Sequence, residues 1–120
     1  MSQFNDSGHV AVTLTETVGL YLRTNFAGEL CGIAERGVGH ATRAGVSGDV
    51  VDVVLHNKQG TIKVVASGAI SADAIVYSAA GGKVGASAST AYPLGIAKEA
   101  AATDGDVIEI MPLVGETAVS

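Results

Sequence analysis

Basic and aromatic residues are both scarce in this chain of 120 residues. It has 7 Lys and Arg against 12 Asp and Glu, which gives a formal net charge of −5. The basic residues stand singly along the chain, whereas a phosphate-binding surface needs them clustered, so we expect no direct contact with nucleic acid. Aromatic residues make up 4% and tryptophan is missing, which leaves few side chains on which a sugar or an unpaired base can stack.

Disulfide, membrane and export signals are missing as well. Cys31 is the single cysteine, and its place between Leu30 and Gly32 predicts a buried free thiol. No apolar run approaches the roughly 18 residues of a membrane span. The polar residues 1–8 lack the apolar core of a signal peptide. We therefore expect synthesis in the cytosol and no membrane partner.

No catalytic or metal-binding motif stands out. His9, His40 and His56 lie on separate segments without a cysteine or carboxylate at metal-ligand spacing, and we expect each to be a surface or edge-strand histidine. We therefore predict no enzyme activity, no catalytic, cofactor-binding or metal-binding residue, and no cofactor. An unrecognised hydrolase stays open as an alternative. It would unite one of these histidines with an acid such as Asp49 or Asp106.

A phrase that occurs twice is the most informative feature that is present. Gly-Ile-Ala-Glu at 32–35 is followed by Ser-Gly-Asp-Val-Val-Asp-Val at 47–53. Gly-Ile-Ala-Lys at 95–98 is followed by Asp-Gly-Asp-Val-Ile-Glu-Ile at 104–110. On this alignment the copies differ by six residues in the intervening loop. A repeated phrase indicates one supersecondary unit used twice.

Short segments with apolar residues at every second position make up most of the chain, as half-buried strands require. Gly37–Gly48 is rich in glycine and predicts a loop, and Asn57–Gly60 predicts a hairpin turn. The predicted strands cover His9–Thr15, Val18–Thr24, Glu29–Glu35, Asp49–His56, Thr61–Ala66, Ile75–Ser78, Lys83–Val84, Tyr92–Lys98 and Asp106–Met111.

The spacing of these strands predicts an all-β fold, a small β-barrel or sandwich of short strands with an internal two-copy motif and little or no helix. The length fits one domain. We expect a flexible amino-terminal arm at 1–8, a single β-rich domain at 9–114 and a frayed tail at 115–120.

Over roughly Gly32–Leu113, the chain resembles the capsid decoration, or cement, proteins of tailed bacteriophages. The resemblance rests on the order of short motifs, and Asp73 and Lys98 depart from it, because the family usually has Gly and Leu there. The motifs are TIKVVASGAIS at 61–71, AIVY at 74–77, AGGKV at 80–84, LGIAKEAA at 94–101 and DGDVIEI at 104–110.

This resemblance implies a small structural protein of the virion that binds the outside of an icosahedral head. Such proteins often sit as trimers and stabilise the shell, so the implied partners are the major capsid protein and two further copies of the chain. The alternative from another class is a small β-barrel adhesive or receptor-binding module on a virion or cell surface.

Two segments are our candidates for capsid contact. The arm, which leads into the strand that begins at His9, could add a strand to the shell. The loop at 37–47, with Arg36 beside it, could meet an acidic shell surface. The candidate contact residues are Ser2, Gln3, Phe4, Asn5, His9, Arg36, His40 and Arg43.

Overall fold

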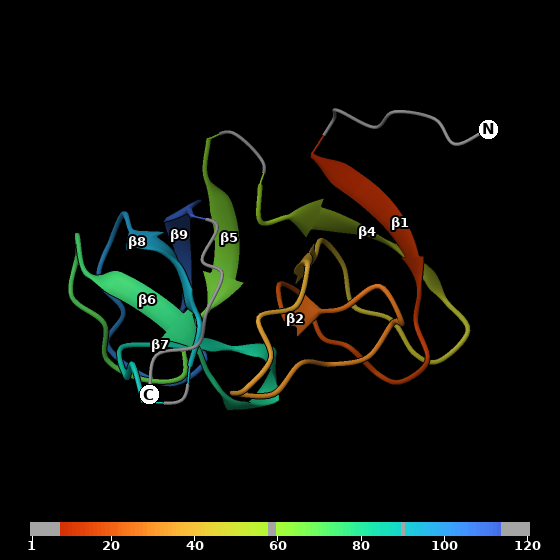
Figure 1. Cartoon of the computed structure of the whole chain (residues 1–120), viewed down its shortest axis with the longest axis horizontal. Helices are drawn as coiled ribbons and strands as arrows, with labels where there is room; N and C mark the ends of the chain where they lie inside the picture. The colour runs from red at the N-terminus through yellow and green to blue at the C-terminus, as the bar shows by residue number, and fades with distance from the viewer. Residues whose placement is uncertain (1–7, 58–59, 90, 114–120) are drawn as a thin grey trace.

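The computed structural model describes residues 8–57, 60–89 and 91–113. Within them it has nine strands and one short 3-10 turn, so the all-β class with little helix is confirmed. The strands form two sheets that lie side by side along the 42 Å long axis of the molecule (Figure 1).

The first half of the chain forms a four-stranded antiparallel sheet. Its strands are β1 (His9–Thr13), β2 (Arg23–Thr24), β3 (Gly39–Ala41) and β4 (Val50–Leu55), in the order β1-β4-β3-β2. The alternation expected for the first strand holds, because Val12 and Leu14 are buried while their neighbours face outward.

The second half forms a five-stranded antiparallel sheet in the order β5-β9-β8-β6-β7. The 3-10 turn η1 (Ala80–Gly82) lies between β6 and β7, and β8 begins at Pro93, a position where proline costs no ladder hydrogen bond. The strands are β5 (Ile62–Val65), β6 (Ile75–Ser78), β7 (Val84–Gly85), β8 (Pro93–Ala97) and β9 (Val107–Pro112).

Each half has its own apolar core. Val12, Leu14, Val51 and Val53 are among the residues of the first core. The second core consists of residues of the second half and one residue of the first half, Val54 of β4, which is 7% exposed. One face of the first sheet is therefore covered by the second half of the chain.

The two halves repeat one another strand by strand, which confirms the internal two-copy motif. In sheet order, β1, β4, β3 and β2 correspond to β5, β9, β8 and β6. The loop bonds correspond too. The Leu14 N–H donates to the backbone carbonyl oxygen of Asp49 at 2.8 Å in the first half. The Ala66 N–H donates to the backbone carbonyl oxygen of Asp106 at 2.8 Å in the second.

The structure corrects the alignment of the repeat. The counterpart of Gly95-Ile96-Ala97 in β8 is Gly39-His40-Ala41 in β3, not the earlier Gly32-Ile33-Ala34. Both glycines are needed for close strand approach, because a Cβ would lie 2.1 Å from the Val54 oxygen at Gly39 and 2.3 Å from the Met111 oxygen at Gly95. Positions 39 and 48 lie 56 and 57 residues before their counterparts, so the six-residue difference shrinks to one residue.

The same correction applies to the segment Gly37–Gly48, which was predicted as a loop. It contains β3, which pairs on both sides, with β2 and β4. The glycine content that indicated a loop reflects close packing at Gly39 instead.

Two predicted strands of the first half are wrong over most of their length. Val18–Thr24 is a strand only at its last two residues, because Tyr21 takes a φ of +63° that interrupts extended backbone. Glu29–Glu35 makes a single bridge, from Leu30 to Thr24. Several of its carbonyls are bound by a buried arginine described below, rather than by a neighbouring strand.

The predicted hairpin at Asn57–Gly60 is also wrong, because β4 and β5 belong to different sheets and do not pair. The segment instead connects the two halves.

Asp73, which departs from the family pattern, takes a φ of +66°. Its counterpart Tyr21 has a φ of +63°, so both halves place a non-glycine residue in this left-handed turn, which aspartate tolerates better than most residues.

Candidate functional site

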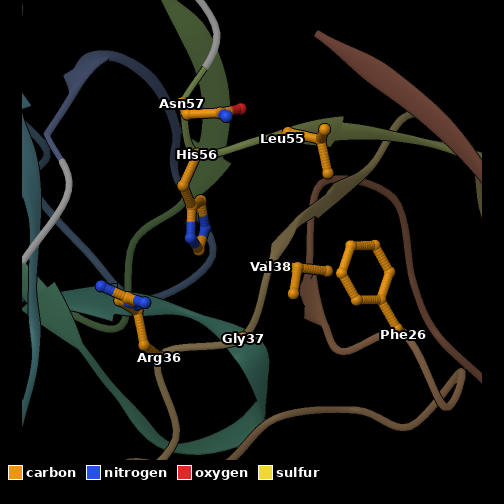
Figure 2. Close-up of a pocket in the computed structure, with 7 residues that line it drawn as sticks. All are labelled: Phe26, Arg36, Gly37, Val38, Leu55, His56 and Asn57. Carbon is orange, nitrogen blue, oxygen red and sulfur yellow. The ribbon is translucent and has the colours of Figure 1, made fainter. Parts of the chain in front are cut away.

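A cavity of about 230 Å³ opens on the first half, between β4 and the segment that leads into β3. Figure 2 shows its two ends: the guanidinium of Arg36 and the ring of His56 lie at one, and the side chains of Val38, Leu55 and Phe26 at the other. Phe26 is 64% exposed, the largest exposed fraction among the big apolar side chains of the described residues. Gly37 and Asn57 complete the lining.

Two histidines are buried at this cavity, where the sequence predicted surface positions: His56 in its lining and His40 next to His56. His40 is fully buried in β3 and His56 is 7% exposed, with their ring centroids 5.0 Å apart. His40 is therefore not placed to touch a shell surface, and its expected exposure is wrong. The reason is that its strand, β3, lies inside the sheet between β2 and β4.

Burial keeps both histidines neutral. It lowers the pKa of His40 to about 4, although a hydrogen bond between Nδ1 and the Tyr21 carbonyl oxygen, 3.0 Å long, opposes the shift. Burial lowers the pKa of His56 to about 2, with smaller contributions from His40 and from the positive charges of Arg23 and Arg36. The positive charge at the cavity thus comes from Arg36 and not from a histidine.

Polar atoms at this end of the cavity lack hydrogen-bond partners. Arg36 Nη1 and both ring nitrogens of His56 are buried and bind nothing in the structure, and the same holds for His40 Nε2. A buried donor without an acceptor costs about 1–3 kcal/mol. A carboxylate brought into the cavity would supply acceptor oxygens and negative charge opposite Arg36, while Phe26 and Val38 would receive the apolar part of the same side chain.

Arg23 of β2 joins the two halves. It is fully buried, and its guanidinium donates to Gly32 at 2.6 Å and Glu35 at 3.2 Å within its own half. It also donates to Lys83 at 2.5 Å and Ala79 at 3.1 Å in the other half. All these acceptors are main-chain carbonyl oxygens. Burial lowers the pKa of the guanidinium, and the nearby side chains of Cys31 and Glu35 oppose that shift.

A second contact between the halves runs from a serine. Ser78 Oγ donates to the Ile33 carbonyl at 2.6 Å and accepts from the Tyr92 backbone at 2.9 Å. Cys31 lies in the same region and is fully buried, as predicted, and burial raises the pKa of its thiol to about 11. This thiol is accordingly a poor nucleophile.

The remaining predicted contact residues are spread over the first half. His9 lies on β1, an edge strand, and pairs with Asp52 at 2.7 Å. Arg43 is exposed and donates to the Val50 carbonyl. Arg36 lines the cavity. The predicted arm residues Ser2, Gln3, Phe4 and Asn5, and the tail at 115–120, lie outside the described residues.

The two acids named for the hydrolase alternative accept hydrogen bonds from backbone N–H groups of nearby loops. Asp49 accepts from the Val46 backbone at 3.0 Å, and Asp106 accepts from Ala102 at 2.8 Å and Thr103 at 3.0 Å. These bonds lower the pKa of Asp106. Across residues 8–57, 60–89 and 91–113, no cluster of three or more His, Cys, Asp or Glu could hold a metal ion, and no helix is long and apolar enough to cross a membrane.

Sequence reasoning found Arg36 but missed the rest of the cavity. Phe26, Val38 and Leu55 come from three separate segments, and no spacing in the sequence connects them. One signal did exist: the correct repeat alignment puts His40 and His56 opposite Ile96 and Leu113, so polar residues of one half replace apolar residues of the other.

Comparison with known proteins settles the family. A family model described as phage cement protein matches residues 6–112. The chain belongs to the phage cement protein family. This is the family that the sequence motifs indicated, and the cement protein is accordingly a structural component of a phage virion.

A solved structure with the same fold comes from another phage. The N base of the head fibre protein gp8.5 of bacteriophage phi29 superposes with a TM-score of 0.70, covering 90% of this chain and 95% of that one at 16% identity. At that identity the likeness concerns the fold. No curated protein matches the cement protein in sequence.

Proposed function

We propose that this cement protein binds the outer surface of a phage capsid and stabilises the shell by bridging neighbouring major capsid subunits. Membership of the phage cement protein family is the observation that carries the proposal. The mechanism is binding energy alone, since rupture or expansion of a decorated shell must also break the decoration contacts. The function requires no catalysis or cofactor, and copies of the chain act together as a homotrimer on the shell.

The first half carries the capsid contact in this proposal. It holds the edge strand β1 that follows the arm, the exposed Arg43, and the cavity with Arg36 and the exposed Phe26. We expect an acidic side chain of the major capsid protein to enter the cavity, because buried donors there lack an acceptor. The arm, residues 1–8, is the second proposed contact, through strand addition to the shell.

Co-sedimentation with undecorated heads of the cognate phage tests this function. Saturable binding and raised heat resistance of the heads are expected for the wild-type protein. Arg36→Glu should weaken binding at least tenfold, because it places a carboxylate against the incoming one. Lys98→Glu is the matched control, since it makes the same charge change at an exposed position of the second half.

The outcomes separate the parts of the proposal. No saturable binding of the wild-type protein to cognate heads would overturn the capsid function. Binding that is equally strong for wild type and Arg36→Glu would overturn the cavity as the contact. Deletion of Ser2–Gly8 should weaken binding while the free protein stays folded, and unchanged binding would remove the arm from the contact.

A second function has one observation in its favour. The fold matches the N base of a head fibre, so the cement protein could carry or form part of an adhesive fibre on the head. Heads that bind the protein without gaining heat resistance, and then bind host cells more strongly, would favour this adhesive role.

A further inference from the structure

The same sheet face is buried in the first half and exposed in the second half. In the first sheet, Arg23, His40 and Val54 are in register across β2, β3 and β4, and all are buried. Val54 packs into the second core and Arg23 donates to carbonyls of the second half, so the second half covers this row.

The equivalent row of the second sheet is open. Ile75, Ile96 and Met111 are in register across β6, β8 and β9. Ile75 is 47% exposed and Met111 46%, and Leu113, the counterpart of the buried His56, is 41% exposed. A stable monomer rarely exposes several neighbouring apolar side chains in one patch, yet all four of these residues are apolar.

We propose that this row, Ile75-Ile96-Met111 with Leu113, is the surface on which a second copy of the chain docks. The argument is the internal repeat: the equivalent face of the first sheet is covered by another unit of the same fold, so the chain itself contains one example of the contact. The inference sharpens the self-assembly part of the proposed function by naming its surface.

The internal contact also indicates the geometry. It joins unlike surfaces, because the row of the first half meets the second core and the β6–β7 connection rather than the row of the second half. We therefore place the first half of the second copy on the row. That half still exposes apolar loop residues, with Leu20 at 44% and Ile33 at 41%. Contacts between unlike surfaces form a ring when the rotation between copies closes, and the proposed trimer requires a ring of three copies.

A charged group limits the row at one side. On β9, two residues before Met111, Glu109 accepts from Thr61 Oγ1 at 2.6 Å and faces Lys98 at 3.4 Å. Two residues further back, Val107 lies on the same face of the same strand and is 48% exposed. Val107 is thus a matched control for Met111, with equal exposure and about 13 Å of strand between them.

Site-directed cross-linking tests the proposal. Cys31 is fully buried and is the single cysteine of the chain, so Met111→Cys and Val107→Cys each create one accessible thiol for a photoactivatable label. The labelled proteins are irradiated free in solution over a range of concentrations and again on saturated heads. We expect Met111→Cys to give an adduct of twice the chain mass, and Val107→Cys to give at least fivefold less.

Three results would overturn the proposal. They are an adduct of Met111→Cys with the major capsid protein, a cross-link within one chain to residues 114–120 found by peptide mapping, and equal yields from the two variants or none in either setting. Head binding is measured on the same samples, so a failure of capsid binding is seen separately from a failure of self-docking. As a second variant, Ile75→Asp should abolish concentration-dependent association in sedimentation velocity, and Val107→Asp should leave it unchanged.

Discussion

The two halves of the cement protein have one backbone plan and two solutions for the same face. In the first half the row across the sheet holds Arg23 and His40, polar side chains that are buried against the second half. In the second half the equivalent positions hold Ile75 and Ile96, apolar side chains on an open face. A buried contact within the chain uses hydrogen bonds that fix one arrangement, whereas the open face carries apolar surface suited to association.

The comparison predicts that the halves respond very differently to equivalent substitutions. Arg23→Met should reduce the free energy of unfolding by about 3 kcal/mol or more, because it leaves the carbonyls of Lys83 and Ala79 buried without donors. The equivalent change, Ile75→Met, should stay within about 0.5 kcal/mol, since that side chain is half exposed. Urea unfolding of both variants measures this. Equal effects would show that Arg23 does not join the halves.

Acid should act on the first half through its histidines. An unfolded chain binds protons near the ordinary histidine pKa of 6.5, while the folded protein holds the pKa of His40 at about 4 and of His56 at about 2. Stability present above pH 6.5 is therefore lost as the pH falls, by up to about 1.4 kcal/mol per pH unit for each histidine.

The second half supplies the control for this pH prediction. His40→Ile combined with His56→Leu installs the residues of the equivalent positions, and should flatten the stability profile between pH 6.5 and 4.5. Below that range the carboxyls Asp106 and Glu109, whose pKa values are lowered in the fold, add their own acid dependence. Urea unfolding at several pH values gives both profiles, and an unchanged slope in the double variant would assign the acid dependence elsewhere.

Substitutions of matching glycines test the equivalence of the halves directly. Gly39→Ala and Gly95→Ala should each cost about 2–3 kcal/mol, because the added Cβ meets a carbonyl oxygen of the next strand. Gly48→Ala and Gly105→Ala should each cost about 1–2 kcal/mol, since both have φ of +96° but open space around them. Thermal unfolding of the four variants should place them in two matched pairs. Unequal costs within a pair would show that the repeat is not maintained at that position.

The sequence predicted the second half much better than the first. Strands β5, β6 and β9 were found to within a residue or two, because their alternation reflects a sheet with one face in the core and the other open. In the first half, β2 and β3 are buried on both faces and therefore lack that alternation. The glycine of β3 then indicated a loop, and matching letters paired Gly95 with Gly32 instead of Gly39.

The candidate site was beyond prediction for a related reason. Arg36 was predicted as a contact residue because of its charge. Phe26 and His56, which line the cavity with it, lie 10 and 20 positions away along the chain. Their meeting depends on the packing of β4 against the segment before β3. A long-range arrangement of that kind leaves no periodic pattern in the sequence.

The acceptors of Arg23 have a consequence for how this chain can change. The carbonyl oxygens of Gly32, Glu35 and Lys83 accept bonds from Arg23 at positions that reach the surface, and no side chain at these three positions takes part in those bonds. Mutations there can alter what the surface offers without loosening the connection between the halves, provided the backbone stays in place. Three positions beside a buried arginine are thus free to change, and the outer surface of the protein can vary while its interior stays the same.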